Sequence, residues 1–529
     1  MSLNLGPIFA SGMVLQRELP MRVWGHADPR SRVEVSVQGH TASCTTEEDG
    51  RWECTLPPLS ASEAEALEVR SGNEHVVLTD VAVGEVFIAA GQSNMEFWMR
   101  YDHMVEAYRL NCTNPRIRFY DQPKCSYPGQ THDFDYSKVG IWRKATPEDL
   151  DYFSAVGYYF ARGLEIVLDV PVGIVGCNYG GTKSLAWMSP EHGRAVQPEQ
   201  TAAFESKLQG LPYEELLTNA RLNPMNDKGY ATWPAWNEFF LPQTPTKEQV
   251  EAFMAAEAQS QSGPADVGGL TIGGFDATSG TTSRHPGLMA PAKDAPGALF
   301  TYMVQPIAGF ATRAVLWYQG ESDDDDDGAQ ARHAEALRTI IADWRAAWHE
   351  PELPFLVVQL PGYESWWMFA AHDWPTIRAG QQQVADEDGH AWLCSIGDTG
   401  TRLDIHPKSK KPVGERLALL ALRHLFGQDL LADAPRCVEV TREGQKVALR
   451  FENAGDGLVI DGNKLESLEL VCNGKAVPFH AAIPGNRLIL VLEEPADGPL
   501  EIRFAQTNWY RINLYNSVDI PALPFIATC

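Results

Sequence analysis

The sequence lacks the features that mark several large classes of protein. No apolar stretch reaches the roughly 18 residues of a membrane-spanning helix, which predicts a soluble protein with no membrane partner. Basic residues form no long stripe, and the formal net charge is −26 at pH 7. Because nucleic acids and anionic membranes are themselves negative, this charge argues against both as partners.

Cysteine is scattered along the chain rather than grouped. The nine cysteines are odd in number and include no CxxC pair, a pattern that argues against a zinc site or a disulfide framework. Cys44 and Cys54 could pair across a hairpin, but two buried thiols are the favoured interpretation. The first residues also lack a basic segment followed by an apolar one, so no signal peptide is visible. A reducing, cytoplasmic location is therefore favoured, although a periplasmic or secreted chain that had lost its leader would look the same.

The G-x-S-x-G elbow of α/β-hydrolases is missing as well. Ser93 lies in the sequence GQSNME, where Met95 stands at the position for which that elbow requires glycine. This argues against the usual α/β-hydrolase class. Taken alone, GQSN is an ordinary strand-to-helix turn, so a catalytic role for Ser93 depends on the residues that accompany it.

The hydrophobic pattern divides the chain into three predicted domains. Residues 1–84 and 431–529 show short strands in which polar and apolar residues alternate, which is typical of β-sandwich-like regions. Residues 85–430 instead contain nearly continuous apolar runs separated by helical patterns, and this indicates a parallel sheet with helices on both faces. Residues from about 200 to 290 break the alternation and are predicted to form an insertion over the sheet.

Polar motifs follow four of the predicted strands. Ser93 comes after EVFIAA, and the turn Gly180–Gly181 comes after VGIVGCN. Gln319 follows AVLW, and the sequence DIHP, with Asp404 and His406, lies beyond AWLCSIGD. Ligands of a parallel sheet bind outside the carboxyl ends of its strands. The topology therefore predicts that these residues gather at one edge.

These residue types are the ones that acyl transfer requires. A serine hydroxyl needs a base to become nucleophilic, and the base needs a partner that orients it. His406 is the candidate base for Ser93, with Asp404 as its candidate partner. The backbone N–H groups of Ser93 and Gly181 and the side-chain amide of Gln319 are candidates for the oxyanion hole. Each motif alone has an ordinary structural interpretation, and their occurrence together and in order favours catalysis.

Polar residues beside these motifs have structural interpretations as well. Glu321 is expected to be a buried carboxylate that holds its loop rather than a general base. Asp323–Asp327, called the acidic run below, precedes a predicted helix, and a solvated lead-in that offsets the helix dipole is favoured over a calcium site. Gln92 and Asn94 could donate hydrogen bonds within the site or only stabilise the turn. Five tryptophans could stack on sugars, but packing is favoured for each: Trp98, Trp187, Trp366, Trp367 and Trp374.

Six stretches resemble the sialate O-acetylesterase family, a branch of the SGNH (GDSL-type) hydrolases related to acetylxylan esterases. They are MVLQRELPMRVWGHA, GEVFIAAGQSNMEFWM, GIVGCNYGGTKSLAWMS, VLWYQGESD, LPFLVVQLPGY and DIHPKSKKPVGERLALLALR. The resemblance covers most of the chain and extends to INLYNSVDIPALPF near its end. It implies a flavodoxin-like three-layer α/β/α core, a serine nucleophile, no metal and no cofactor.

Carried over residue by residue, the resemblance makes Ser93 the nucleophile, His406 the base and Asp404 its partner. Gln319 takes the place of the oxyanion-hole asparagine of other SGNH hydrolases, and the GGT turn supplies a backbone donor. One departure concerns the acid. Many SGNH enzymes have aspartate three residues before the histidine, whereas Asp404 is two before it. Asp398 is therefore an alternative partner, and a Ser–His dyad aided by a backbone carbonyl is another possibility.

The expected function is that of a carbohydrate O-acetylesterase acting on O-acetylated sugars or glycans, with sialic acids as the expected substrates. The alternatives are an acetylxylan esterase acting on plant polysaccharide and a carbohydrate-binding protein without activity. A sialate carboxylate would favour an arginine, for which Arg100, Arg313 and Arg378 are candidates. The substrate-binding residues, the sugar, the acetyl position and the oligomeric state stay open.

Overall fold

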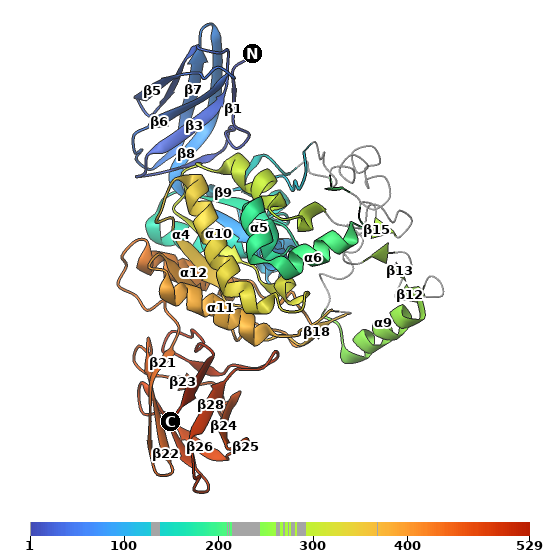
Figure 1. The fold of residues 1–529 in the computed structure, drawn as a ribbon. Coiled ribbons are helices and arrows are strands. Elements are labelled where there is room, and N and C mark those ends of the chain that lie inside the picture. Colours follow the sequence, from blue (N-terminus) through green and yellow to red (C-terminus); the bar gives the residue numbers. More distant parts are fainter. Residues whose placement is uncertain are drawn as a thin grey trace.

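The computed structural model describes residues 2–128, 138–208, 292–367 and 369–529, with short segments between residues 210 and 282. An α/β core lies between two β regions, one at each end of the chain (Figure 1). The predicted insertion falls largely outside the described residues, and the domain boundaries at residues 84 and 430 stay predictions. Within the insertion the described elements are α9 (Lys247–Ser260), β12 (Ala265–Val267), β13 (Leu270–Ile272), β14 (Phe275–Asp276) and β15 (Thr281–Thr282).

The core is built on parallel strands in the order β9-β11-β8-β16-β17-β20. Their bounds are β8 (Glu74–Gly91), β9 (Asn114–Asp121), β11 (Val172–Asn178), β16 (Ala314–Tyr318), β17 (Phe355–Val358) and β20 (Ala391–Cys394), and β10 (Trp142–Ala145) adds an antiparallel edge beside β9. Without β9 the strand order by position in the chain is 2-1-3-4-5, as in doubly wound sheets. Every residue of β11, β16 and β17 is buried, because both faces of the sheet are covered. The predicted parallel sheet is thus confirmed.

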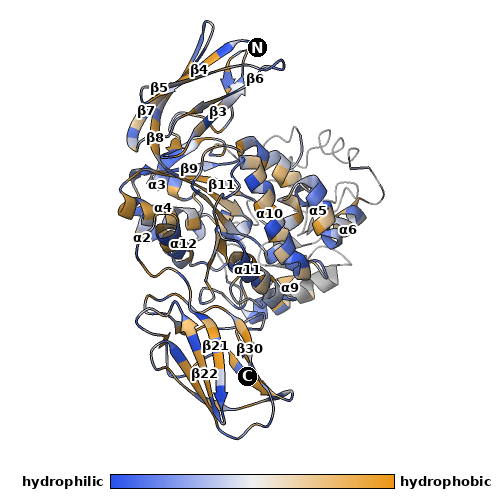
Figure 2. Ribbon diagram, turned by 60° about the vertical axis from the view of Figure 1, so that its left-hand side comes forward, coloured by the Kyte–Doolittle hydropathy of each residue, from blue (hydrophilic) through white to orange (hydrophobic). Residues whose placement is uncertain are grey.

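Helices cover the two faces of this sheet. Alternate side chains of β8 enter different hydrophobic clusters, since successive residues of a strand point to opposite faces. Phe87 packs with α4 (Ala155–Leu168) and α12 (Lys411–His424), whereas Ile88 packs with α10 (His333–Trp348). Figure 2 shows hydrophilic and hydrophobic residues side by side on α10 and on α11 (Trp374–Glu387). The helices are α1 (Ser93–Glu96), α2 (Val105–Arg109), α3 (Pro147–Leu150), α4 (Ala155–Leu168), α5 (Pro190–Val196), α6 (Pro198–Lys207), α10 (His333–Trp348), α11 (Trp374–Glu387) and α12 (Lys411–His424). None of the described helices is long and apolar enough to cross a membrane.

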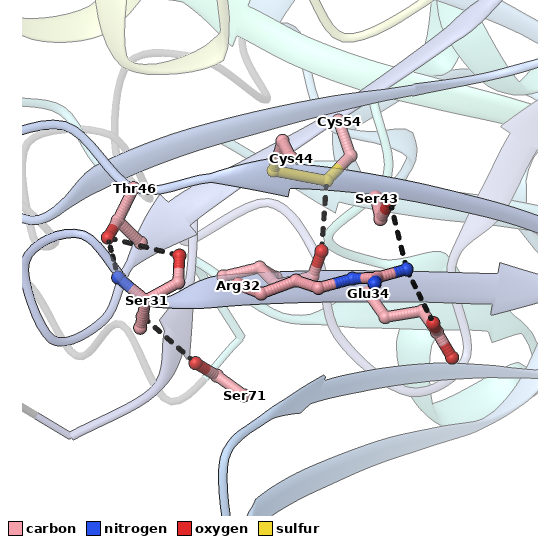
Figure 3. Close-up of a disulfide and its surroundings, with 9 residues drawn as sticks. Ser31, Arg32, Glu34, Ser43, Cys44, Thr46, Cys54 and Ser71 are labelled. Carbon is pink, nitrogen blue, oxygen red and sulfur yellow. Dashed lines mark hydrogen bonds and ion pairs between the residues drawn. A yellow bond between two sulfur atoms is a disulfide. The ribbon is translucent and has the colours of Figure 1, made fainter.

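The N-terminal strands form two sheets that face each other. One sheet contains β1 (Asn4–Leu5), β3 (Met21–His26) and β6 (Arg51–Leu56); the other contains β2 (Val14–Gln16), β4 (Arg32–Val37), β5 (His40–Thr45), β7 (Ser62–Ser71) and the first part of β8. Strand β8 then continues into the core, so one strand belongs to both regions. A disulfide between Cys44 and Cys54 joins β5 to β6 across the two sheets (Figure 3).

The disulfide shows that the favoured interpretation of Cys44 and Cys54 as two buried thiols is wrong. The Cα atoms of the two residues lie 5.5 Å apart, a separation that a disulfide spans without backbone movement. The spacing of the two cysteines could not reveal this, because the pairing depends on how the two sheets face each other.

The C-terminal strands enclose a hydrophobic cluster of their own. One sheet has the order β21-β22-β27-β26 and the other the order β25-β24-β28-β30. Their bounds are β21 (Arg436–Glu443), β22 (Lys446–Glu452), β24 (Leu468–Cys472), β25 (Lys475–Ala476), β26 (Phe479–Ala482), β27 (Arg487–Leu492), β28 (Leu500–Phe504) and β30 (Phe525–Thr528). Strand β22 alternates buried residues with exposed or partly exposed ones, as the predicted half-buried strands require.

Candidate active site

Ser93 lies where β8 turns into the short helix α1. Gly91 ends the strand with φ +129°, and a Cβ at this position would come 2.0 Å from the carbonyl oxygen of Tyr318. Glycine therefore allows the ends of β8 and β16 to approach closely. Gln92 is the N-cap of α1, and Ser93 begins the helix and is partly exposed.

His406 reaches Ser93 from the loop between β20 and α12. Its Nε2 atom is 2.9 Å from Ser93 Oγ, which is hydrogen-bonding distance. The ring is 6% exposed and stands edge-on to Trp366, with the ring centres 4.8 Å apart. Burial lowers the pKa of His406 well below its usual value, and the charges of Lys408 and Lys410 lower it further. His406 is therefore held in the neutral form that accepts a proton.

Asp404 contacts the backbone of His406 rather than its ring. Oδ1 accepts a hydrogen bond from the His406 backbone N–H at 2.9 Å. Oδ2 accepts from Lys408 Nζ at 2.7 Å and from Thr244 Oγ1 at 2.9 Å. The Nδ1 atom of His406 is buried and makes no hydrogen bond with any described residue. The carboxylate thus holds the loop that carries His406, and its role in orienting the ring stays a prediction.

Asp398, the alternative partner, is engaged elsewhere. Both of its carboxylate oxygens accept hydrogen bonds from the Arg416 guanidinium, at 2.6 and 2.8 Å. Arg416 belongs to α12 and also donates to the backbone oxygens of Ser395 and Asp519. This pair therefore ties the start of the 395–410 loop to α12 and to the C-terminal region.

The predicted oxyanion donors lie against the same turn as Ser93. A Cβ on Gly180 would come 3.3 Å from Ser93 Cβ, so the turn after β11 packs directly on the nucleophile. Gly181 has φ +62°, which favours glycine. Gln319 is fully buried at the end of β16, and its Nε2 donates to the Thr182 carbonyl at 3.3 Å. An amide nitrogen carries two hydrogens, so a second donor remains on Nε2.

Gln92 and Asn94 flank Ser93 and fasten its turn to two other loops. The side-chain oxygen of Gln92 accepts from the backbone N–H of Ser322 at 3.3 Å. Asn94 Nδ2 donates to Glu321 Oε1 at 2.6 Å and to the backbone oxygen of Ile405 at 2.9 Å. The turn with the nucleophile is thereby held to the loop after β16 and to the loop that carries the base.

Glu321 and Lys410 complete a buried polar network behind the nucleophile. Lys410 Nζ donates to Asn94 Oδ1, and Asn94 Nδ2 donates to Glu321 Oε1. Burial raises the pKa of Glu321 to about 7. Burial and the charge of Lys408 lower the pKa of Lys410 to about 7. The favoured interpretation of Glu321 as a carboxylate that holds its loop agrees with these contacts.

The acidic run matches the predicted solvated lead-in only in part, because Asp325 and Asp327 are exposed whereas its first two residues are not. Asp323 and Asp324 are buried, because each accepts several hydrogen bonds that replace water. Asp323 accepts from the Ser184 backbone N–H and pairs with His333 Nδ1, both at 2.8 Å. Asp324 accepts from the backbone N–H of His372 at 2.6 Å. Among the described residues no cluster of His, Cys, Asp or Glu has the arrangement of a metal site.

The tryptophans and arginines named from the sequence pack against other groups of the protein, and Trp366 does so against the His406 ring. Trp187, Trp366, Trp367 and Trp374 are buried, while Trp98 is partly exposed and stacks on Tyr101. Arg313 precedes β16, at the sheet edge opposite Ser93, and pairs with Glu85. Arg378 is buried and donates to backbone oxygens of the C-terminal region. Arg100 lies over the rings of Tyr101 and Tyr152.

Comparisons with known proteins find carbohydrate esterases similar to this chain. A family profile described as carbohydrate esterase, sialic acid-specific acetylesterase, matches residues 277–423. The sialate O-acetylesterase of Mus musculus is 23% identical over 97% of this chain and 92% of its own length. That of Homo sapiens is 26% identical over 42% of this chain and 47% of its own length. The family resemblance is confirmed.

A solved structure also matches almost the whole chain. The crystal structure of a carbohydrate acetylesterase from Xanthomonas citri superposes with a TM-score of 0.73 and 25% identity, covering 99% of both chains. Together with the sialate O-acetylesterase relatives, this likeness confirms the expectation of an ester hydrolase of the carbohydrate esterase type.

Proposed function

We propose that the protein removes O-acetyl groups from sialic acids through an acetyl-enzyme intermediate on Ser93. The observation that carries this proposal is the 2.9 Å contact between Ser93 Oγ and His406 Nε2 at the carboxyl edge of the sheet. The likeness to sialate O-acetylesterases supports the substrate class. We further propose that the core is of the flavodoxin-like SGNH type, and that it is one domain between the two β regions.

The first half of the reaction transfers the acetyl group to the enzyme. Ser93 Oγ attacks the acetyl carbonyl carbon while His406 Nε2 takes the hydroxyl proton. The carbonyl oxygen gains negative charge, for which the N–H groups of Ser93 and Gly181 and the amide of Gln319 are donors. The ester bond to the sugar then breaks, and His406 returns its proton to the sugar oxygen.

The second half releases acetate. Water attacks the acetyl group on Ser93 while His406 again takes a proton. The second tetrahedral intermediate then collapses to acetate as the bond to Ser93 Oγ breaks, and His406 returns its proton to Oγ. Since both halves need neutral histidine as a base, the buried surroundings of His406 suit the chemistry. Asp404 contributes by fixing the His406 backbone.

The decisive experiment is hydrolysis of p-nitrophenyl acetate by the wild type, Ser93→Ala and His406→Ala. Both variants are expected to lose at least about 1000-fold in kcat/KM, because each removes an atom of the proton transfer. Equal activity of Ser93→Ala and wild type, with both folded, would falsify the proposal. Release of acetate from O-acetylated sialic acids and from acetylated xylan then identifies the sugar, and a preference for xylan would overturn the sialate assignment.

The role of the acid is tested by comparing Asp404→Asn with Asp398→Asn. We expect Asp404→Asn to lower kcat by about tenfold or more, because it weakens the hold on the loop that positions His406. Asp398→Asn is expected to lower the melting temperature through its lost pair with Arg416, with little change in kcat. A large kcat loss in Asp398→Asn alone would make Asp398 the functional acid.

A further inference from the structure

The two peptide groups on either side of Gly180 are each held by a charged side chain. The backbone N–H of Gly180 donates to Glu96 Oε2 at 2.6 Å. The carbonyl oxygen of Gly180 accepts from Lys293 Nζ at 2.8 Å. Glu96 belongs to the same short helix as Ser93, and Lys293 lies in the turn Ala292–Asp294 that follows the insertion.

Because Lys293 binds the Gly180 carbonyl, it also determines the direction of the Gly181 N–H. In a trans peptide the C=O and N–H bonds lie in one plane and point in opposite directions. The Gly180 carbonyl points at Lys293, so the Gly181 N–H points away from Lys293. A Cβ on Gly181 would come 3.2 Å from Lys293 Nζ, which places the ammonium group beside this turn.

Lys293 is itself held in place by its surroundings. Its ammonium group lies 5.1 Å from the ring centre of Tyr179, the residue before the turn. On the other side, Gly180 is in contact distance of Ser93, because a Cβ there would come 3.3 Å from Ser93 Cβ. The turn is therefore held between Lys293, which binds the Gly180 carbonyl, and Ser93.

We propose that Lys293 is a positioning residue of the oxyanion hole, which aims the Gly181 N–H at the oxygen that becomes negative when Ser93 attacks. A cation on the carbonyl also polarises the peptide and makes its N–H a stronger donor. Preorganised donors stabilise the transition state more than the ground state. The inference rests on the proposed serine mechanism. It adds a residue that contacts neither Ser93 Oγ nor His406 in the described structure but controls a group that contacts the reacting oxygen.

The test compares Lys293→Met and Lys293→Arg with wild type on p-nitrophenyl acetate. Lys293→Met keeps the length of the side chain but removes the charge and the donors. We expect kcat to fall by about tenfold or more with KM changed less than about twofold, because the lost interaction acts in the transition state. Lys293→Arg is expected to recover most of the activity, since the guanidinium can still donate to the carbonyl. Lys475→Met, at an exposed position of β25, is the matched control.

A second readout separates positioning from simple folding support. A boronic acid that binds serine as a tetrahedral adduct should lose affinity for Lys293→Met in proportion to kcat/KM. A rise in KM without a fall in kcat, or unchanged boronate affinity, overturns the proposal. Lys293→Gln replaces the methionine variant should that variant be insoluble. If Ser93→Ala is inactive and Lys293→Met is fully active, only this inference fails; if Ser93→Ala keeps full activity, the proposed function fails.

Discussion

At the residue scale, the surroundings of His406 combine burial with positive charge. Lys408 and Lys410 lie on the same loop, and Asp404 compensates Lys408 through a contact of 2.7 Å. Both lysines and the burial favour neutral imidazole. The acid limb of kcat/KM reports the pKa of the base in the free enzyme. We therefore expect activity to persist to a pH below the ordinary histidine pKa of about 6.5.

This expectation predicts the effect of Lys408→Met. The change removes a cation near His406 and leaves the Asp404 carboxylate without its compensating charge, and both effects raise the pKa of His406. The acid limb of the pH profile should move to higher pH by about one unit. Lys411→Met, at a partly exposed lysine that pairs with Glu415, should leave the limb in place. A limb that stays or moves to lower pH in Lys408→Met contradicts the electrostatic account.

Sequence patterns could place the main site residues but not their support. Ser93, Gly181, Gln319 and His406 follow buried apolar strands, and parallel topology brings such strand ends to one edge. The burial of Lys408 and the contact of Lys293 with the Gly180 carbonyl could not be predicted, because a lysine is ordinarily solvated and both features depend on how the loops pack. For the same reason the burial of Asp323, which depends on Ser184 and His333, was missed.

At the element scale, the disulfide is the covalent link between the two N-terminal sheets. It closes a loop with a sequence separation of 10 residues. In the chain-entropy account such a loop is worth about 3 kcal/mol of stability. The disulfide lies between β5 and β6 in the N-terminal region, which is remote from Ser93 in the sequence.

Cys44→Ser should therefore lower the melting temperature and leave kcat unchanged. Wild type should melt at a lower temperature in the presence of a reducing agent, whereas Cys44→Ser should not respond to it. Cys437→Ser, at a free cysteine of β21, serves as the control and should behave as wild type. If reductant leaves the melting temperature of the wild type unchanged, the disulfide does not stabilise the protein.

At the scale of the whole molecule, a buried carboxylate joins the N-terminal region to the core. Glu85 is fully buried in β8 and accepts hydrogen bonds from Gln16, Arg17 and Arg313. Gln16 belongs to β2 and Arg313 precedes β16, so three segments meet at one side chain. Removing one partner from a buried ion pair leaves the remaining charges unpaired, which commonly costs about 3–5 kcal/mol.

Glu85→Gln is accordingly expected to lower the free energy of unfolding by about 3 kcal/mol or more, measured by denaturant unfolding. Glu18 offers a matched control, since it lies 3.7 Å from the same two arginines but its side chain is 62% exposed. Surface ion pairs contribute little, so Glu18→Gln should cost less than about 1 kcal/mol. Similar losses in the two variants would show that burial of Glu85 is not what makes the contact important.

Strand β8 has a consequence for how the chain can be divided. Its 18 residues extend about 60 Å, from the tip of the N-terminal sheet to the turn that holds Ser93. The predicted boundary at residue 84 lies inside this strand, where Gly84 pairs with Gln16 of β2 and Val83 pairs with Ser62 of β7. A protease would therefore find no linker at this boundary. A chain that began at residue 85 would have to form β8, an inner strand of its sheet, from a newly created N-terminus.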